Sequence, residues 1–277
     1  MSLRFPFLKM HGAGNDFVVI DHRIPIVTGD LAALVTRLCD RRRGVGADGV
    51  LLLERDPEFD FAMRYRNANG GVAEFCGNGA RCLARLALDL GLGHGGEVRF
   101  RTDVGVQSAR RSADGRGIDL HFGHVDTPVS VRGIEAAGRT FEGRTVCAGV
   151  PHLVIAVERV DGLPIGEWGG ALRRHARFAP EGTNVDFVAR GAGPRVAMRT
   201  YERGVEGETL ACGSGAIASA LCAIAEGVSS TVMVETAGGD QLAVTARAER
   251  GGWDVRLVGP AEVAYAGTWS EAATVTS

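Results

Sequence analysis

Two short segments of this chain have nearly the same sequence, and each opens an alanine-rich apolar run. The first is Cys76-Gly77-Asn78-Gly79-Ala80, and the second is Cys212-Gly213-Ser214-Gly215-Ala216. The apolar residues that follow fall at helical spacing, which predicts helices over residues 78–90 and 214–225. Such a repeat within 277 residues favours a fold of two similar halves, each starting a helix at a cysteine.

A cysteine at a helix start has a particular chemistry. The first turn leaves four backbone N–H groups without an intrahelical acceptor and carries a partial positive charge, which biases a thiol there toward thiolate. The glycines beside Cys76 and Cys212 expose these N–H groups to an anion such as a carboxylate. Two such thiols suit an enzyme that moves a proton between the two faces of one carbon.

Composition and charge exclude several classes of partner. With 45% hydrophobic residues the chain can bury a sizeable core, and its formal net charge of -2 comes with mixed signs. No basic stripe or polybasic amphipathic segment is present, so neither nucleic acid nor a membrane surface is expected as a partner. No run approaches the roughly 20 apolar residues of a membrane span, and no secretory signal is seen, so a cytoplasmic protein is expected.

The numbers of cysteines and lysines limit which metals and cofactors the chain is expected to bind. The six cysteines are too few for a disulfide scaffold and form no C-x-x-C pair, so no metal site is expected. Thirty of the 31 basic residues are arginines, and the single lysine is Lys9. A pyridoxal Schiff base would have to use that residue near the N-terminus, so pyridoxal phosphate is not expected. No Gly-Lys dipeptide exists, which excludes a P-loop.

The rest of the chain consists of short strands and glycine-rich turns around the two apolar helices. A buried strand is predicted over residues 15–21, a helix over 31–39, and further strands lie between and after the cysteine helices. A weaker sequence similarity relates Asn15-Asp16-Phe17-Val18 to Asn184-Val185-Asp186-Phe187-Val188, which supports a duplication. The halves are expected to join near residues 123–131.

Several segments together resemble one family, the diaminopimelate epimerases, from about residue 8 to 265. The resemblance rests on the segments 9–17 (with Asn15), 44–49, 76–82, Pro151-His152, Tyr201-Glu202-Arg203-Gly204 and 208–215. It implies an α/β (α+β) fold of two pseudo-symmetric domains, each a mixed, largely antiparallel sheet wrapped around a central helix. We expect one domain over residues 1–122, joined by 263–277, and the other over 123–262.

The resemblance also implies the chemistry: epimerisation of LL-diaminopimelate to meso-diaminopimelate, in lysine and cell-wall precursor biosynthesis, without a cofactor. Cys76 and Cys212 would flank the α-carbon, one as thiolate and the other as thiol, and His152 and Glu202 would tune them. Tyr265 would lie at a homodimer contact. The residues implied to bind this diamino dicarboxylic acid are Asn15, Asn67, Gly77, Asn78, Asn184, Glu202, Arg203, Gly213 and Ser214.

Two departures from the family pattern bear on specificity. Most members carry Gly-Asn-Pro-His where this chain has Gly149-Val150-Pro151-His152, which removes an amide expected at the distal end of the substrate. The segment 204–209 is also one residue longer than the commonest spacing, which could shift its backbone donors.

Alternatives remain open at this point. One is a related cofactor-independent racemase of another amino acid, although proline racemases carry Cys-Gly-His where Asn78 stands here. Another is an isomerase of the phenazine type, which uses a carboxylate in place of the thiols and is disfavoured by Cys76. A third is a non-catalytic amino-acid binder, which would not need either thiol. A reversible Cys76–Cys212 disulfide is compatible with catalysis.

Overall fold

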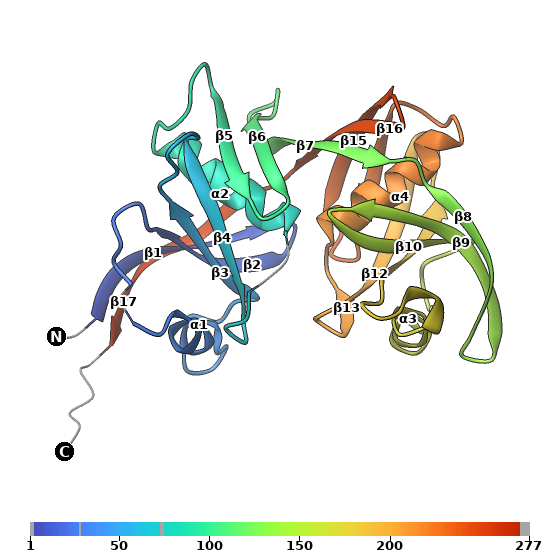
Figure 1. Cartoon of the computed structure of the whole chain (residues 1–277), viewed down its shortest axis with the longest axis horizontal. Helices are drawn as coiled ribbons and strands as arrows, with labels where there is room; N and C mark the ends of the chain where they lie inside the picture. Colours follow the sequence, from blue (N-terminus) through green and yellow to red (C-terminus); the bar gives the residue numbers. More distant parts are fainter. Residues whose placement is uncertain (1–2, 28, 73–74, 272–277) are drawn as a thin grey trace. The chain divides into compact units, whose positions relative to one another are not determined.

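A computed structural model describes residues 3–27, 29–72 and 75–271 of the chain. The chain divides into two compact units, and the first is discontinuous. Unit 1 comprises Met1–Ile118 and Pro260–Ser277, and unit 2 comprises Asp119–Gly259. Each unit contains a sheet and a long helix (Figure 1).

The sheet of unit 1 is mixed, and most of its strand pairs are antiparallel. Strand β1 pairs with β17 and β2, β3 with β4, and β5 with β6, all antiparallel, while β2–β3 and β4–β5 are parallel. In spatial order the strands are β17 (Glu262–Glu271), β1 (Leu3–Gly12), β2 (Asn15–Asp21), β3 (Gly49–Glu54), β4 (Phe61–Asn67), β5 (Glu97–Thr102) and β6 (Gly105–Arg111).

Unit 2 repeats this pattern. The pairs β8–β9, β9–β10, β11–β12 and β14–β15 are antiparallel, and β10–β11 and β12–β14 are parallel. Strand β15 continues antiparallel to β16, which pairs with β7, and the short β13 extends the edge of β12. The strands are β8 (Val129–Ala136), β9 (Arg139–Ala148), β10 (Val150–Val157), β11 (Asn184–Arg190), β12 (Arg195–Glu202), β13 (Gly207–Thr209), β14 (Thr231–Glu235), β15 (Gln241–Glu249), β16 (Gly252–Gly259) and β7 (Ile118–Asp126).

The helices occupy matching places in the two units. In unit 1, α1 (Leu31–Cys39) links β2 to parallel β3, and α2 (Gly77–Asp89) links β4 to parallel β5. In unit 2, α3 (Ile165–Arg173), followed by the short helix η1 (Ala176–Phe178), links β10 to β11, and α4 (Gly213–Ala225) follows β12 and β13 and leads to β14. The predicted pseudo-symmetric α/β architecture is confirmed.

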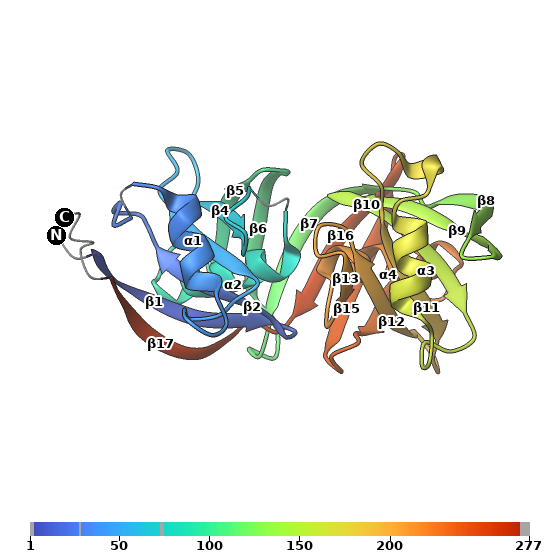
Figure 2. The same ribbon diagram turned by 90° about the horizontal axis from the view of Figure 1, so that it is seen from below.

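Helices α2 and α4 are enclosed by their own sheets, as their nearly uniform apolar surfaces predict. Every residue of α4 is buried except Ala225, and in α2 only Arg85, Leu88 and Asp89 escape full burial. Helices α2 and α4 each contact most strands of their unit. Helices α1 and α3 cover the opposite sheet faces and lie in front of the strands in Figure 2. The sheets therefore separate an inner helix from an outer one.

Both inner helices start and end close to where the sequence predicts. Cys76 and Cys212 are the N-cap residues, and the glycines that follow the helices, Gly91 and Gly227, have φ of 71° and 80°. Glycine adopts such left-handed backbone without the steric cost of a Cβ atom, which is why it commonly ends helices.

The strand register shows which positions of the two units correspond. Phe17 pairs with Gly49, which pairs with Asn67 across the next ladder. In unit 2, His152 pairs with Asn184 in the same way. Asn184 therefore corresponds to Gly49 of β3 rather than to Asn15 of β2, so the sequence similarity between Asn15 and Asn184 does not mark equivalent positions.

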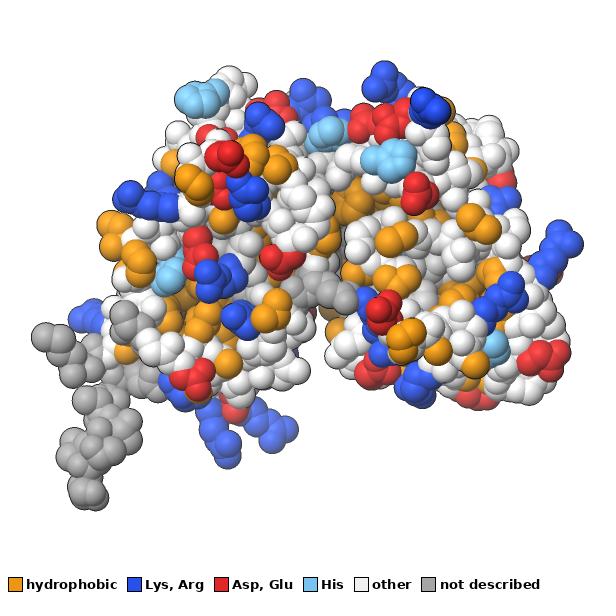
Figure 3. Space-filling model, in the orientation of Figure 1, with side chains coloured by type: hydrophobic (Ala, Val, Ile, Leu, Met, Phe, Trp, Pro, Cys, Tyr) orange, Lys and Arg blue, Asp and Glu red, His pale blue; other side chains and the backbone are white. Residues whose placement is uncertain are grey.

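The surface carries both signs of charge. On the face shown in Figure 3, basic and acidic side chains are interspersed over each unit. None of the helices in the described ranges combines the length and the apolar content of a membrane span.

Candidate functional site

The first cysteine caps α2 with its own sulfur. Cys76 has extended backbone (φ -125°, ψ 111°), and its Sγ accepts the N–H of Gly79 at 3.4 Å. The side chain is half-buried. Gly77 and Asn78 begin the helix, so their N–H groups belong to the first turn, where backbone donors lack intrahelical acceptors.

Two asparagines lie against this thiol. Cys76 Sγ donates to Asn15 Oδ1 at 3.5 Å, and Asn78 Nδ2 donates to the same oxygen at 3.2 Å. The other end of the Asn78 amide accepts from the fully buried Arg81 at 2.8 Å. Arg81 also donates to the carbonyls of Gly77 and Pro260, so a buried cation stands in the first turns of α2.

Asn15 is positioned by a hairpin. Only Ala13 and Gly14 separate β1 from β2, and both have left-handed φ, 55° and 81°, as a two-residue turn that matches strand twist requires. The Asn15 amide then donates from Nδ2 to Asp48 Oδ2 at 2.7 Å. Because Asp48 can only accept when ionised, it directs the Asn15 carbonyl oxygen toward Cys76.

A charged network supports Asp48. Arg41 donates to Asp48 at 2.8 Å and bonds both oxygens of Asp16, which Lys9 also reaches. Burial raises the pKa of Asp16, but the hydrogen bonds from Arg41 and Lys9 outweigh it and lower this pKa to about 2. Asp16 therefore stays ionised and holds the two basic groups in place.

The second cysteine has almost the same backbone as the first. Cys212 (φ -123°, ψ 113°) caps α4, and its Sγ accepts the N–H of Gly215 at 3.4 Å. A Cβ atom on Gly215 would lie 2.5 Å from Asp186 Oδ1, so only glycine fits beside that carboxylate. Gly213 and Ser214 start this helix as Gly77 and Asn78 start the other.

A chain of hydrogen bonds leads from Cys212 into the core of unit 2. Its Sγ lies 3.4 Å from Ser214 Oγ, which is 2.9 Å from His152 Nε2. His152 Nδ1 lies 2.7 Å from Asp186 Oδ2, and both side chains are fully buried. With its Nδ1–H held by Asp186, the neutral ring presents a lone pair at Nε2, which can accept a proton through Ser214.

Asp186 is a residue of the candidate site that the sequence interpretation did not single out. Thr200 Oγ1 donates to its second oxygen at 2.7 Å, so both oxygens are engaged. Side chains two apart on a strand share a face, and β10 and β11 are neighbours, so His152, Asn184 and Asp186 lie together. This alternation was a signal present in the sequence.

Glu202 ends β12 beside the second thiol. Thr209 Oγ1 donates to it at 2.5 Å, and burial raises the pKa of Glu202 against the opposing effects of Thr209, the His152 ring and a hydrogen bond with Cys212. Asn67, which ends β4, is half-buried and occupies the place in unit 1 that Glu202 occupies in unit 2.

At Cys212, burial opposes the bias toward thiolate that is expected at a helix start. Burial, followed by the negative charges of Glu202 and Asp186, raises the pKa of Cys212 well above its ordinary value. The hydrogen bonds that Cys212 makes with Ser214 and Gly215 oppose this rise without overcoming it. At neutral pH this residue is a thiol, and it becomes a thiolate only by passing its proton to a nearby base.

The remaining expected residues lie at the ends of neighbouring strands. Asn184 donates from Nδ2 to Pro151 O at 3.2 Å and accepts the backbone N–H of Arg203 at 2.8 Å. The segment after Arg203 contains β13, which pairs back onto β12. Val150 is buried at the position in β10 that Asn15 holds in β2, two residues before His152 and Phe17 respectively.

Tyr265 lies far along the chain from these groups, on β17. It is 47% exposed, and its ring meets Phe7 edge-on at 6.2 Å. Among the described residues, no cluster of three or more His, Cys, Asp or Glu side chains could hold a metal ion.

Comparisons with known proteins identify sequence relatives along most of the chain. The family model described as diaminopimelate epimerase matches residues 7–127 and 144–261. The diaminopimelate epimerase of Aquifex aeolicus is 39% identical over 249 residues, covering 86% of this chain and 88% of that protein. The diaminopimelate epimerase of Aromatoleum aromaticum is 40% identical over 281 residues, covering 96% of this chain and 98% of that protein.

Solved structures share the fold at low sequence identity. A hydroxyproline epimerase from Agrobacterium vitis has a TM-score of 0.71 at 18% identity, covering 97% of this chain and 93% of its own. A phenazine biosynthesis protein of the PhzF family from Bacillus anthracis has a TM-score of 0.72 at 12% identity, covering 96% and 99%. These likenesses establish the fold alone.

Proposed function

The chain belongs to the diaminopimelate epimerase family and is an isomerase, and we propose that it interconverts LL- and meso-diaminopimelate by proton transfer at one α-carbon. The observation that carries this proposal is the matched pair of N-cap cysteines. Cys76 and Cys212 have the same backbone conformation, cap corresponding helices and accept the N–H three residues later. The mechanism requires these thiols to act on opposite faces of the α-carbon.

Cys212 has a route for losing its proton. Its hydrogen bond to Ser214 leads to His152, and Asp186 stabilises the imidazolium that forms. Cys76 donates to the carbonyl of Asn15. In the direction considered first, the reaction starts with a Cys212 thiolate and a Cys76 thiol.

The proton transfers then balance over one turnover. The Cys212 thiolate removes the α-proton, and the Cys76 thiol delivers its proton to the opposite face of the carbanion. Cys212 ends as a thiol and Cys76 as a thiolate, and the reverse reaction exchanges these roles. Before the next turnover in the same direction, Cys76 takes a proton from solvent and Cys212 releases one. The first-turn N–H groups of α2 and the buried Arg81 favour negative charge in unit 1.

The carbanion is the intermediate of highest free energy, and backbone N–H donors are the groups suited to stabilise it. We assign the substrate α-carboxylate to the first-turn N–H groups at Gly77-Asn78 and Gly213-Ser214, which strengthen as charge develops on it. Arg203 suits a second carboxylate because guanidinium groups bind carboxylates in bidentate fashion. The reaction proposed in this way uses no cofactor, and its product would serve lysine biosynthesis.

The test is solvent-deuterium incorporation at the α-carbon of LL-diaminopimelate, followed by NMR in reduced enzyme with and without pyridoxal phosphate. We expect exchange with epimerisation in the wild type, indifferent to pyridoxal phosphate, and loss of epimerisation in Cys76→Ala and Cys212→Ala. Cys147→Ser is the matched control, since Cys147 is exposed and caps no helix. Absence of exchange with diaminopimelate but exchange with another amino acid would favour a related racemase.

We also propose that β17 forms a contact between two copies of the chain. Residues Glu262 to Ala266 are exposed along a ten-residue strand, and Tyr265 stands among them. A long exposed edge strand is prone to pair with another chain unless something covers it. Sedimentation analysis of Tyr265→Asp should show a shift from dimer to monomer, and an unchanged dimer would contradict this contact.

A further inference from the structure

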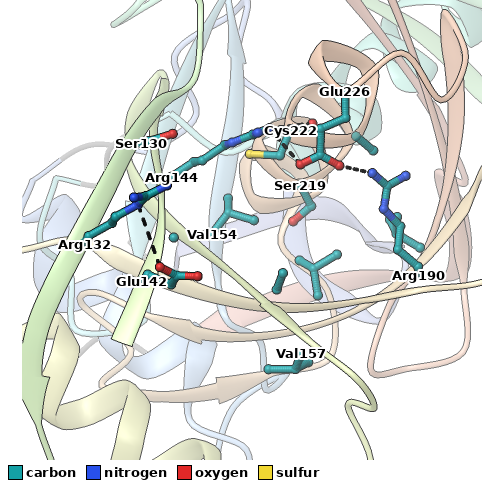
Figure 4. Close-up of a pocket in the computed structure, with 15 residues that line it drawn as sticks. Ser130, Arg132, Glu142, Arg144, Val154, Val157, Arg190, Ser219, Cys222 and Glu226 are labelled. Atoms are coloured by element: carbon teal, nitrogen blue, oxygen red, sulfur yellow. Dashed lines mark hydrogen bonds and ion pairs between the residues drawn. The ribbon is translucent and has the colours of Figure 1, made fainter. Parts of the chain in front are cut away.

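A cavity of about 260 Å³ opens in unit 2, and none of the proposed catalytic side chains lines it (Figure 4). Strands β8 to β12 and the C-terminal half of α4 form its walls. The volume equals that of about nine water molecules at liquid density, which is enough for a short apolar chain with a polar head.

The floor of the cavity is apolar. Val154, Val188 and Val196 project from three neighbouring strands, and α4 contributes Cys222 and Ala223. All five are buried, with exposed fractions of 8% or less. An apolar floor offers water few hydrogen-bond partners, so displacing water from it by an apolar group is favourable.

The rim carries an excess of positive charge. Three arginines line the cavity, at 132, 144 and 190, against the two carboxylates of Glu142 and Glu226. Arg144 pairs with Glu226 at 3.0 Å, and Arg190 pairs with the same carboxylate, as Figure 4 shows for Arg190. One carboxylate therefore serves two guanidinium groups.

The guanidinium group of Arg132 has N–H donors that are available to a ligand. Its closest carboxylate, Glu142, lies 3.9 Å away, beyond hydrogen-bond distance, and both side chains are largely exposed. Within the described part of the chain, no hydrogen bond is made by the Arg132 guanidinium. The rim thus offers a planar fork of donors, which suits a carboxylate geometrically.

We propose that this cavity is a second binding site, for a small monocarboxylate with an unbranched apolar body. The carboxylate lies against Arg132 and Arg144, where it completes the charge balance of the rim. The apolar body lies on the valine floor, with Cys222 at its side.

The site is separated from the proposed catalytic groups although it shares their elements. Helix α4 carries Cys212 at its start and Cys222 ten residues later, which is about 15 Å along a helix axis. Strand β11 begins with Asn184 and ends with Arg190, so the catalytic groups and the cavity lie at opposite ends of the same strand. A ligand here need not resemble the substrate.

Isothermal titration calorimetry of the full chain with octanoate tests the proposal, with octylammonium as the charge-reversed probe. We expect saturable octanoate binding and at least tenfold weaker binding of octylammonium. Equal affinity for both probes would show a nonselective apolar slot, and absence of saturable octanoate binding would refute the site directly.

Variants locate the binding. Arg132→Glu should weaken octanoate binding at least tenfold, whereas Arg159→Glu, at an exposed arginine outside the cavity, should not change it. Ala156→Trp places a large side chain into the cavity from its rim and should abolish octanoate binding while isomerase activity is retained. Undiminished octanoate binding to a folded Ala156→Trp variant would place the ligand elsewhere, including at the substrate site. If that variant does not fold, Arg132→Glu decides.

Discussion

Asp48 accepts a 2.7 Å hydrogen bond from the side-chain amide of Asn15 and thereby determines which end of that amide faces Cys76. The carbonyl end accepts from the thiol and from Asn78, so Asn15 connects a surface carboxylate to a proposed catalytic sulfur. Neither residue is covalently or sequentially near Cys76. The geometry around the first thiol is thus set by three separate segments of unit 1.

Replacing Asp48 should disturb the reaction by releasing this amide. In Asp48→Ala, Asn15 can rotate and present its NH₂ group to Cys76, which removes the acceptor of the thiol proton. We expect kcat to fall about tenfold, equivalent to ~1.4 kcal/mol, with little change in thermal stability. Steady-state epimerisation kinetics test this, and Asp60→Ala, at another partly exposed aspartate of unit 1, is the control. Equal activity of both variants would remove Asp48 from the positioning role.

Ser214 connects Cys212 to His152, so its hydroxyl should matter far more than its volume. Ser214→Ala interrupts the proton route and should lower kcat about 100-fold, in the range for loss of acid–base assistance. Ser219→Ala is a close control, because Ser219 is also buried on α4 and bonds only Met198 among the described residues. A mild effect at Ser214, similar to that at Ser219, would mean that protons reach Cys212 by another route.

Glu202 helps to keep Cys212 protonated. Burial is the largest cause of the raised pKa of Cys212, and the charge of Glu202 comes next, so removing that charge should lower this pKa. In Glu202→Gln, alkylation of Cys212 by iodoacetamide should rise at lower pH than in the wild type, as peptide mass spectrometry would quantify. Glu208→Gln is the control, since Glu208 pairs with Arg199. A midpoint that stays constant or moves upward would contradict this electrostatic role.

The two glycines at corresponding helix positions should respond differently to alanine. A Cβ on Gly215 would meet Asp186 Oδ1 at 2.5 Å, whereas a Cβ on Gly79 would meet the end of the flexible Leu51 side chain at 3.0 Å. We expect Gly215→Ala to lose about 1–3 kcal/mol of unfolding free energy, typical of overpacking, and most activity. Gly79→Ala should be nearly neutral, because alanine favours helix. Urea unfolding of both variants measures the difference.

The elements that the sequence predicts well are those whose signals are local. In each unit, the N-cap cysteine, the apolar helix and the terminating glycine lie within a few helical turns of one another along the chain. These features, which end at Gly91 and Gly227, all appear in the structure. The repeated motif also predicted the repeated architecture. Helix capping and apolar spacing depend on neighbours in sequence, so they can be predicted without knowledge of tertiary contacts.

What the sequence did not reveal depends on register and burial. Asp48 and Asp186 were not singled out, because their partners Asn15 and His152 are 33 and 34 residues away. The raised pKa of Cys212 depends on distant residues for a related reason. Its helix start is local, but the depth of burial and the nearby carboxylates of Glu202 and Asp186 come from other strands.

Asp16 should make the stability of unit 1 depend on pH. Its folded pKa of about 2 is below the ordinary 3.8, so its ion pairs with Lys9 and Arg41 stabilise the fold above pH 4 and are lost as pH falls through 2. The contribution is at most about 2.5 kcal/mol by linkage. Urea unfolding at pH 7 and pH 3 should show a smaller difference in Asp16→Asn than in the wild type. Asp161→Asn, at an exposed surface aspartate, should keep the wild-type difference, and the same behaviour in Asp16→Asn would show that this network does not control acid stability.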